Sequence, residues 1–93
     1  MKAILGLDTS CYTTSVAAVT PAGELIAAHR RLLEVEAGAR GLQQSQGVFQ
    51  HAVWLPRLVE QLGEEMKAVD WCAICASTRP RPASSSYMPV FQV

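Results

Sequence analysis

Residues 5–19 read LGLDTSCYTTSVAAV, and this stretch decides the fold that the rest of the chain must fit. It begins in an apolar run, passes through one carboxylate and several hydroxyls, and continues into a second β-rich run. The pattern predicts antiparallel strands at residues 2–8 and 14–20, joined by a tight polar turn. Such a turn presents backbone N–H groups and hydroxyls to a phosphate, beside an aspartate that holds a divalent metal or its water. An ordinary hairpin with a polar tip is the alternative.

The elements after this hairpin predict a mixed sheet. The segment PAGE at residues 21–24 has the composition of a turn, because proline fixes φ and glycine adopts positive φ. A third strand is expected at residues 25–33. A polar loop at 34–41 and a helix at 43–66 lead to a fourth strand at 71–77, which is suited to parallel pairing with the first. The fold class is therefore α/β in the order β-β-β-α-β, with three antiparallel strands and a parallel fourth.

The predicted helix has one apolar stripe and a proline in its interior. An interior proline costs about 3 kcal/mol or more unless the helix bends, so we expect a kink at Pro56. Two helices that meet near Leu55 are the alternative. His51 and His29 are both better explained as histidines satisfied by ordinary hydrogen bonds than as ligands or bases. The stripe consists of Val48, Ala52, Leu55, Val59, Leu62 and Met66.

Length and composition indicate a globular chain that is one small domain or a piece of a larger one. It has 93 residues, of which 49% are hydrophobic and 17% charged, and 8 basic residues balance 8 acidic ones. The balance gives no electrostatic footprint for nucleic acid or for an anionic membrane. No apolar stretch reaches the ~18 residues of a membrane span. Since the N-terminus also lacks the apolar core of a signal peptide, we expect a cytoplasmic protein.

The cysteines favour a structural interpretation. An odd number of 3 argues against a disulfide scaffold. Cys72 and Cys75 form a C-x-x-C, but they lie within the apolar run WCAICA, which predicts a buried strand. Positions three apart on a strand point to opposite faces, and the chain has no second cysteine or histidine pair at ligand spacing. We therefore expect buried, inert thiols and assign no metal ligand.

These features together resemble the amino-terminal portion of the Kae/TsaD glycoprotease family, historically labelled O-sialoglycoprotein endopeptidase, within the actin-like ATPase (ASKHA) superfamily. The similarity lies in ILGLDTSC at residues 4–11, TSVA at 14–17, GEL at 23–25 and HAVWLPRL at 51–58. The resemblance implies a partial ribonuclease-H-like fold in which the first hairpin turn faces the phosphates of ATP, held with a divalent metal. The cofactor-binding residues that it implies are Asp8, Thr9, Ser10, Cys11 and Thr14.

The family is associated with threonylcarbamoyl transfer to a tRNA adenosine. The resemblance implies that residues 1–93 are the truncated amino-terminal part of an actin-like ATPase lobe, inactive alone and without a tightly bound cofactor. Catalysis would then need the second lobe, and no catalytic residue is assigned in this part. One alternative is a non-catalytic paralogue that acts as a scaffold or dimerisation module; Tyr12 and Thr13 favour it, because family enzymes carry acidic residues there. A sugar- or acid-kinase-like ATPase lobe is the other.

The expected partners follow from the partial fold. Its fourth strand has an uncovered edge, and exposed edges and half-covered faces pair with other surfaces. We therefore expect a homodimer through the sheet edge or the helix face, and contact with the second lobe of the same chain. A loop is expected at residues 78–86, where Arg79 and Arg81 stand near three serines. A solvated loop held extended by its prolines explains it better than a phosphate-gripping one.

Overall fold

The computed structural model describes residues 1–35 and 44–78, and its elements follow the predicted order. Every predicted element is present, with each end within one residue of the expected position. The loop predicted at residues 78–86 lies outside the described residues except for Thr78, and that at 34–41 lies largely outside them. The elements are β1 (Lys2–Asp8), β2 (Thr13–Val19), β3 (Leu25–Leu32), α1 (Gln44–Glu65) and β4 (Asp70–Ser77).

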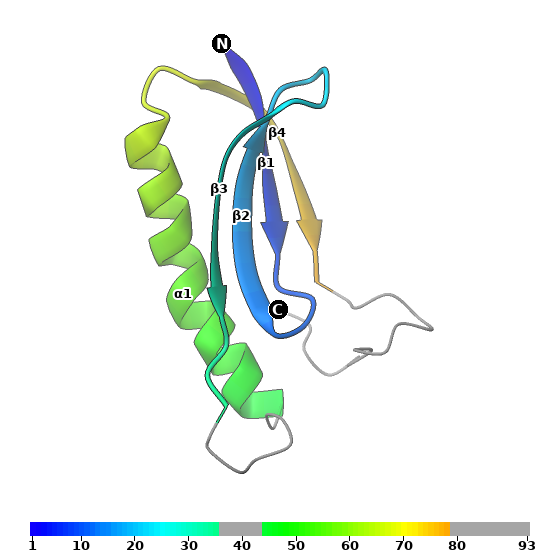
Figure 1. Ribbon diagram of the computed structural model, residues 1–93, viewed down its shortest axis with the longest axis vertical. Coiled ribbons are helices and arrows are strands. Elements are labelled where there is room, and N and C mark those ends of the chain that lie inside the picture. The colour runs from blue at the N-terminus through cyan, green and yellow to red at the C-terminus, as the bar shows by residue number, and fades with distance from the viewer. Residues whose placement is uncertain (36–43, 79–93) are drawn as a thin grey trace.

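The strands form one four-stranded mixed sheet in the order β3-β2-β1-β4 (Figure 1). β1 pairs antiparallel with β2 and parallel with β4, and β2 pairs antiparallel with β3. The α/β class, the three antiparallel strands and the parallel fourth are therefore confirmed. β1 lies inside the sheet, as its apolar character on both faces predicts.

The β2–β3 turn uses the residues that its sequence indicates. Gly23 has φ of 94°, a region that L side chains rarely adopt. Its N–H donates to the carbonyl of Thr20 (2.9 Å), and the Thr20 N–H donates to the carbonyl of Glu24 (2.8 Å). The Glu24 N–H donates in turn to Thr20 Oγ1 (3.0 Å). This turn brings β3 back alongside β2 and fixes their register.

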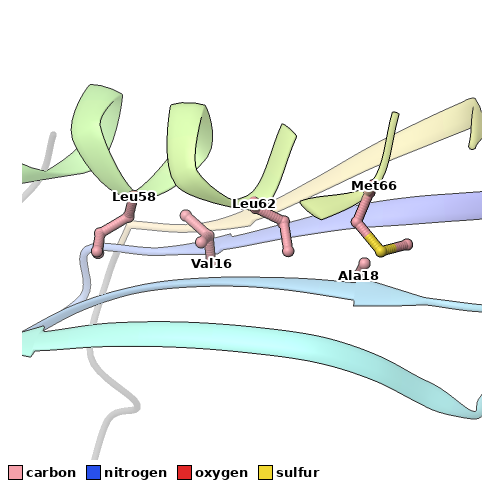
Figure 2. Packing of buried hydrophobic residues seen from close by; sticks show 5 residues of the cluster. All are labelled: Val16, Ala18, Leu58, Leu62 and Met66. Atoms are coloured by element: carbon pink, nitrogen blue, oxygen red, sulfur yellow. The ribbon is translucent and has the colours of Figure 1, made fainter. Parts of the chain in front are cut away.

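The core lies between α1 and one face of the sheet. β2 alternates half-buried and buried residues, which is the pattern of a strand with one covered face. In Figure 2 the side chains of α1 point toward those of β2. Leu5 and Leu7 of β1 pack against the edge of this cluster. Its buried members are Val16, Ala18, Leu58, Leu62 and Met66.

The buried face of α1 differs in phase from the predicted stripe. Leu62 and Met66 are buried as expected, but Ala52 is exposed, and Gly47 and His51 are buried instead. Leu58 is also buried although it lies off the predicted stripe, and the buried face includes the polar side chain of His51, which a stripe of apolar residues leaves out. α1 is a single helix of 22 residues with Pro56 inside it, which makes the two-helix alternative wrong. The kink at Pro56 stays a prediction.

The expectation of a buried fourth strand is wrong. Every residue of β4 is exposed, including Cys72 and Cys75, so these thiols are not buried. The reason is the placement of α1, which lies over β2 and β3 and leaves β4 at the far edge of the sheet (Figure 1). Ile74 is 68% exposed although it stands beside Leu5 in the register. An apolar run predicts a strand here but not its burial.

Candidate functional site

The β1–β2 turn lies at the carboxyl end of the parallel strands β1 and β4 (Figure 1). The register places Asp8, the last residue of β1, between Ser15 of β2 and Ser77 of β4. The N–H of Thr9 donates to the Ser77 carbonyl (2.9 Å), so the start of the turn is tied to β4. In open α/β sheets the carboxyl ends of the strands are where ligands bind.

The carboxylate of Asp8 organises the first half of the turn. Its Oδ1 accepts the backbone N–H of Ser10 (2.8 Å) and the Ser10 hydroxyl (2.5 Å). This is the aspartate turn in which a side chain replaces a backbone acceptor. Both hydrogen bonds end on Oδ1, and Oδ2 accepts no hydrogen bond from the described residues. Asp8 is also only half-buried. The second oxygen can therefore serve a ligand, a metal or a metal-bound water.

Three of the five predicted site residues line one shallow depression at the turn. Asp8, Ser10 and Cys11 border a space of about 260 Å³, together with Tyr12, Thr13 and Ser15. Hydroxyls and one carboxylate dominate this lining. The depression thus combines donors suited to an anion with one acidic group suited to a cation.

The other two predicted site residues point away from solvent. Thr14 is fully buried, and its hydroxyl forms a 2.6 Å hydrogen bond with Nδ1 of His51. Thr9 is 3% exposed, and its hydroxyl has no hydrogen-bond partner among the described residues. The structure thus brings Asp8, Ser10 and Cys11 to the surface of the turn and places these two threonines beneath it. Direct contact of either threonine with a cofactor stays a prediction.

His51 of α1 is a residue whose link to this turn the sequence did not predict. Its side chain is fully buried, and Nε2 lies 2.8 Å from the backbone carbonyl of Cys11. A carbonyl only accepts, so Nε2 carries the proton; in the neutral ring Nδ1 then accepts the hydroxyl proton of Thr14. The prediction of a satisfied histidine is confirmed.

A signal for this contact does exist in the sequence. His51 precedes Leu55 by four positions and Leu58 by seven, the spacings of one helical face. A polar residue in phase with the buried face needs a partner from another element, because an unsatisfied buried polar group is costly. His29, by contrast, pairs with Glu65 of α1. That contact is exposed and ties β3 to the end of the helix.

The turn fits a metal only together with a phosphate. No cluster of three or more histidine, cysteine, aspartate or glutamate side chains occurs within residues 1–35 and 44–78. Among the described residues, Asp8 is the one carboxylate that lines the depression. Mg²⁺ at nucleotide sites is commonly held by one or two carboxylates, by substrate phosphates and by water. A single aspartate beside several hydroxyls matches that donor set.

Comparison with protein-family models and with curated proteins gave no match to this chain. The described part of the chain has no helix with the length and apolar character needed to span a membrane. The function of this chain must therefore be inferred from the geometry of the β1–β2 turn.

Proposed function

We propose that this chain forms the first part of the nucleotide-binding lobe of a Kae/TsaD-like glycoprotease-family protein, with a partial ribonuclease-H-like fold. Two features support the proposal. The first is the element order β-β-β-α-β with a parallel fourth strand, which is the order of elements that the resemblance implies. The second is the position of the DTSC segment, residues 8–11, which begins with the last residue of the inner strand β1.

In this proposal the turn binds the phosphates of ATP. Backbone N–H groups and the Ser10 hydroxyl would donate to phosphate oxygens, and Asp8 would hold Mg²⁺ or one of its waters. Bound ATP would supply a phosphoanhydride bond, and the residues of this chain would bind and orient its phosphates. Threonylcarbamoyl transfer to tRNA would require a second lobe, so we assign no catalytic residue to the residues described and expect this part to be inactive alone.

The observation that carries the proposal is the half-buried Asp8 carboxylate at the end of an apolar inner strand. A charge there costs free energy unless it has a partner, and Ser10 reaches only one of its oxygens among the described residues. An aspartate that served the turn alone could be replaced by asparagine, because asparagine forms the same side-chain turn. An aspartate that serves a metal could not, because the amide lacks the charge.

The test compares Asp8→Asn with Asp70→Asn in the whole chain. Asp70 is exposed and stands at the opposite end of β4, so the control makes the same charge change far from the turn. Amide resonances are followed by NMR during titration with ATP, with and without Mg²⁺. We expect the amide shifts to be largest at residues 8–15, which include the lining of the depression, and a dissociation constant of ~1 mM, equivalent to a binding free energy of about 4 kcal/mol.

Asp8→Asn should weaken the magnesium-dependent binding several-fold, and Asp70→Asn should leave it unchanged. The proposal would be contradicted if ATP and Mg²⁺ left the turn resonances of the unmodified chain unchanged. It would also be contradicted if Asp8→Asn bound ATP and Mg²⁺ as tightly as the unmodified chain. ADP and inorganic phosphate as further titrants separate recognition of the nucleotide from recognition of a phosphate alone.

A second candidate function is that of a dimerisation module, favoured by the outer edge of β4. This edge has no strand partner among the described residues, and Trp71 and Ile74 are 38% and 68% exposed. Sedimentation equilibrium should then detect a dimer that Ile74→Lys dissociates. Leu25→Lys is the matched control, because Leu25 is 66% exposed on the opposite edge strand β3. A monomer at all concentrations would refute this candidate.

A further inference from the structure

One side chain of α1 contacts both the β1–β2 turn and strand β2. Through its two ring nitrogens, His51 reaches the carbonyl of Cys11 within the turn and the hydroxyl of Thr14 at the start of β2. These contacts span 37 and 40 residues of sequence. His51 and Thr14 are both fully buried, so their hydrogen bond is shielded from competing water, and the bond to the Cys11 carbonyl is partly buried.

We infer that His51 is a positioning residue, which sets the conformation of the turn through the Cys11 carbonyl and so prepares the turn for its ligand. The ligand part of this inference rests on the proposed function; the conformational part does not. His51 itself lies beneath the turn and does not line the depression. It would act on a ligand only through the backbone that it holds.

The geometry of the peptide unit explains how the contact between His51 and the Cys11 carbonyl fixes the backbone of the turn. In a trans peptide the C=O and the following N–H point in opposite directions. Since the Cys11 carbonyl points to His51 on the α1 side, the N–H of Tyr12 points away from that side. The next peptide is fixed as well, because the Tyr12 carbonyl accepts the N–H of Leu33 (2.7 Å). Two successive peptide planes are thus held, one by α1 and one by the segment after β3.

A turn held in this way binds its ligand with less loss of conformational freedom. Ordering a loop on binding lowers affinity, and a loop already ordered avoids most of that cost. A merely structural histidine would stabilise the fold without this effect. The two roles differ in which of the two contacts matters, because the Thr14 contact anchors β2, whereas the Cys11 contact fixes the turn.

Two conservative variants separate the contacts. In His51→Gln the terminal amide reaches the position of Nε2 and can donate to the Cys11 carbonyl. In His51→Asn the shorter amide reaches the position of Nδ1 and can accept from Thr14, but it falls short of Cys11. Both remove part of the ring, so both should lower stability. Only His51→Asn should release the turn.

The readout is backbone order by NMR relaxation, first without any ligand. We expect faster motion of residues 10–12 in His51→Asn than in His51→Gln, with the amides of β3 alike in both. With ATP and Mg²⁺ added, His51→Asn should bind roughly three- to tenfold more weakly, the loss of one hydrogen bond, and His51→Gln about as well as the unmodified chain. Equal turn order in the two variants, or affinity that follows stability alone, would overturn the inference.

The unmodified chain supplies an independent measurement if a variant does not fold. Its ring-nitrogen resonances should show His51 protonated on Nε2, and ligand binding should move them while those of His29 stay in place. A His51 ring protonated on Nδ1 and bare at Nε2 would refute the assignment. Absence of any ATP binding would refute the proposed function instead. The comparison of backbone order in the turns of the two variants would still decide whether His51 positions the turn.

Discussion

Thr14→Val gives the most direct measure of the buried contact between β2 and α1. Valine has nearly the shape of threonine, so the change replaces a hydroxyl with a methyl and leaves the packing in place. Thr14 and His51 are both fully buried, and their side chains are 2.6 Å apart. Losing the hydroxyl leaves Nδ1 of His51 without its donor, which costs about 1–3 kcal/mol. The added apolar group returns about 0.8 kcal/mol, so the net loss in the free energy of unfolding should be about 0.2–2 kcal/mol.

A double-mutant cycle with His51→Leu turns this cost into a coupling energy. In the His51→Leu background the Thr14 hydroxyl is itself the unsatisfied group, so Thr14→Val should be neutral or stabilising there. The two effects of the same substitution should therefore differ by about 1–3 kcal/mol. A domain of this size has a total stability of roughly 5–14 kcal/mol, so the difference is measurable.

Urea unfolding followed by tryptophan fluorescence is the assay, since Trp54 lies on α1 and Trp71 on β4. Thr13→Val is the matched control, because Thr13 is the neighbouring residue of β2 and forms no hydrogen bond with His51. Its effect should stay within about 0.5 kcal/mol in both backgrounds. If the effects of Thr14→Val and His51→Leu simply add, the hydrogen bond contributes nothing specific and the reasoning that it anchors β2 to α1 is refuted.

Three further predictions concern the helix and the thiols. Leu62→Ala should lower the free energy of unfolding by about 2–5 kcal/mol, because Leu62 is 1% exposed in the core, whereas Gln61→Ala on the exposed face should change it by less than about 0.5 kcal/mol in the same urea assay. Pro56→Ala should raise the thermal midpoint, since proline in a helix interior is about 3 kcal/mol less favourable than alanine; an unchanged or lower midpoint would show that the helix has adapted to the proline. Mild oxidation should give no bond between Cys72 and Cys75, because residues three apart on a strand are about 10 Å apart and a disulfide needs less than about 7 Å; mass spectrometry of the digested monomer would reveal such a bond.

The strands and their pairing were predictable because local pattern and connection length both point to them. The short apolar runs end at the polar segment after Leu7 and at the turn that contains Gly23. A short turn permits only antiparallel pairing of the strands that it joins. The helix between β3 and β4 allows the parallel return of β4 to β1. These are properties of neighbouring residues, which one sequence carries in full.

The burial of particular side chains was not predictable in the same way. Ile74 and Cys75 read as core residues, yet they are exposed because α1 covers the other half of the sheet. The sequence predicted His51 to be an ordinary satisfied histidine, which it is, but its partners lie far away in sequence, in the β1–β2 turn and in β2. Where a helix lies on a sheet, and which residues meet across the gap, depends on packing between distant segments. A periodic pattern in one segment does not contain that information.

Because α1 covers only part of the sheet, the strands differ in how readily they unfold locally. Among the described residues, β4 is hydrogen-bonded to a single strand and α1 does not lie over it, so its amide protons should exchange with solvent far sooner than those of β2. The hydrogen bond from Thr9 to Ser77 links this outer strand to the turn. Each brief detachment of β4 would therefore release one side of the turn while the buried histidine still held the other.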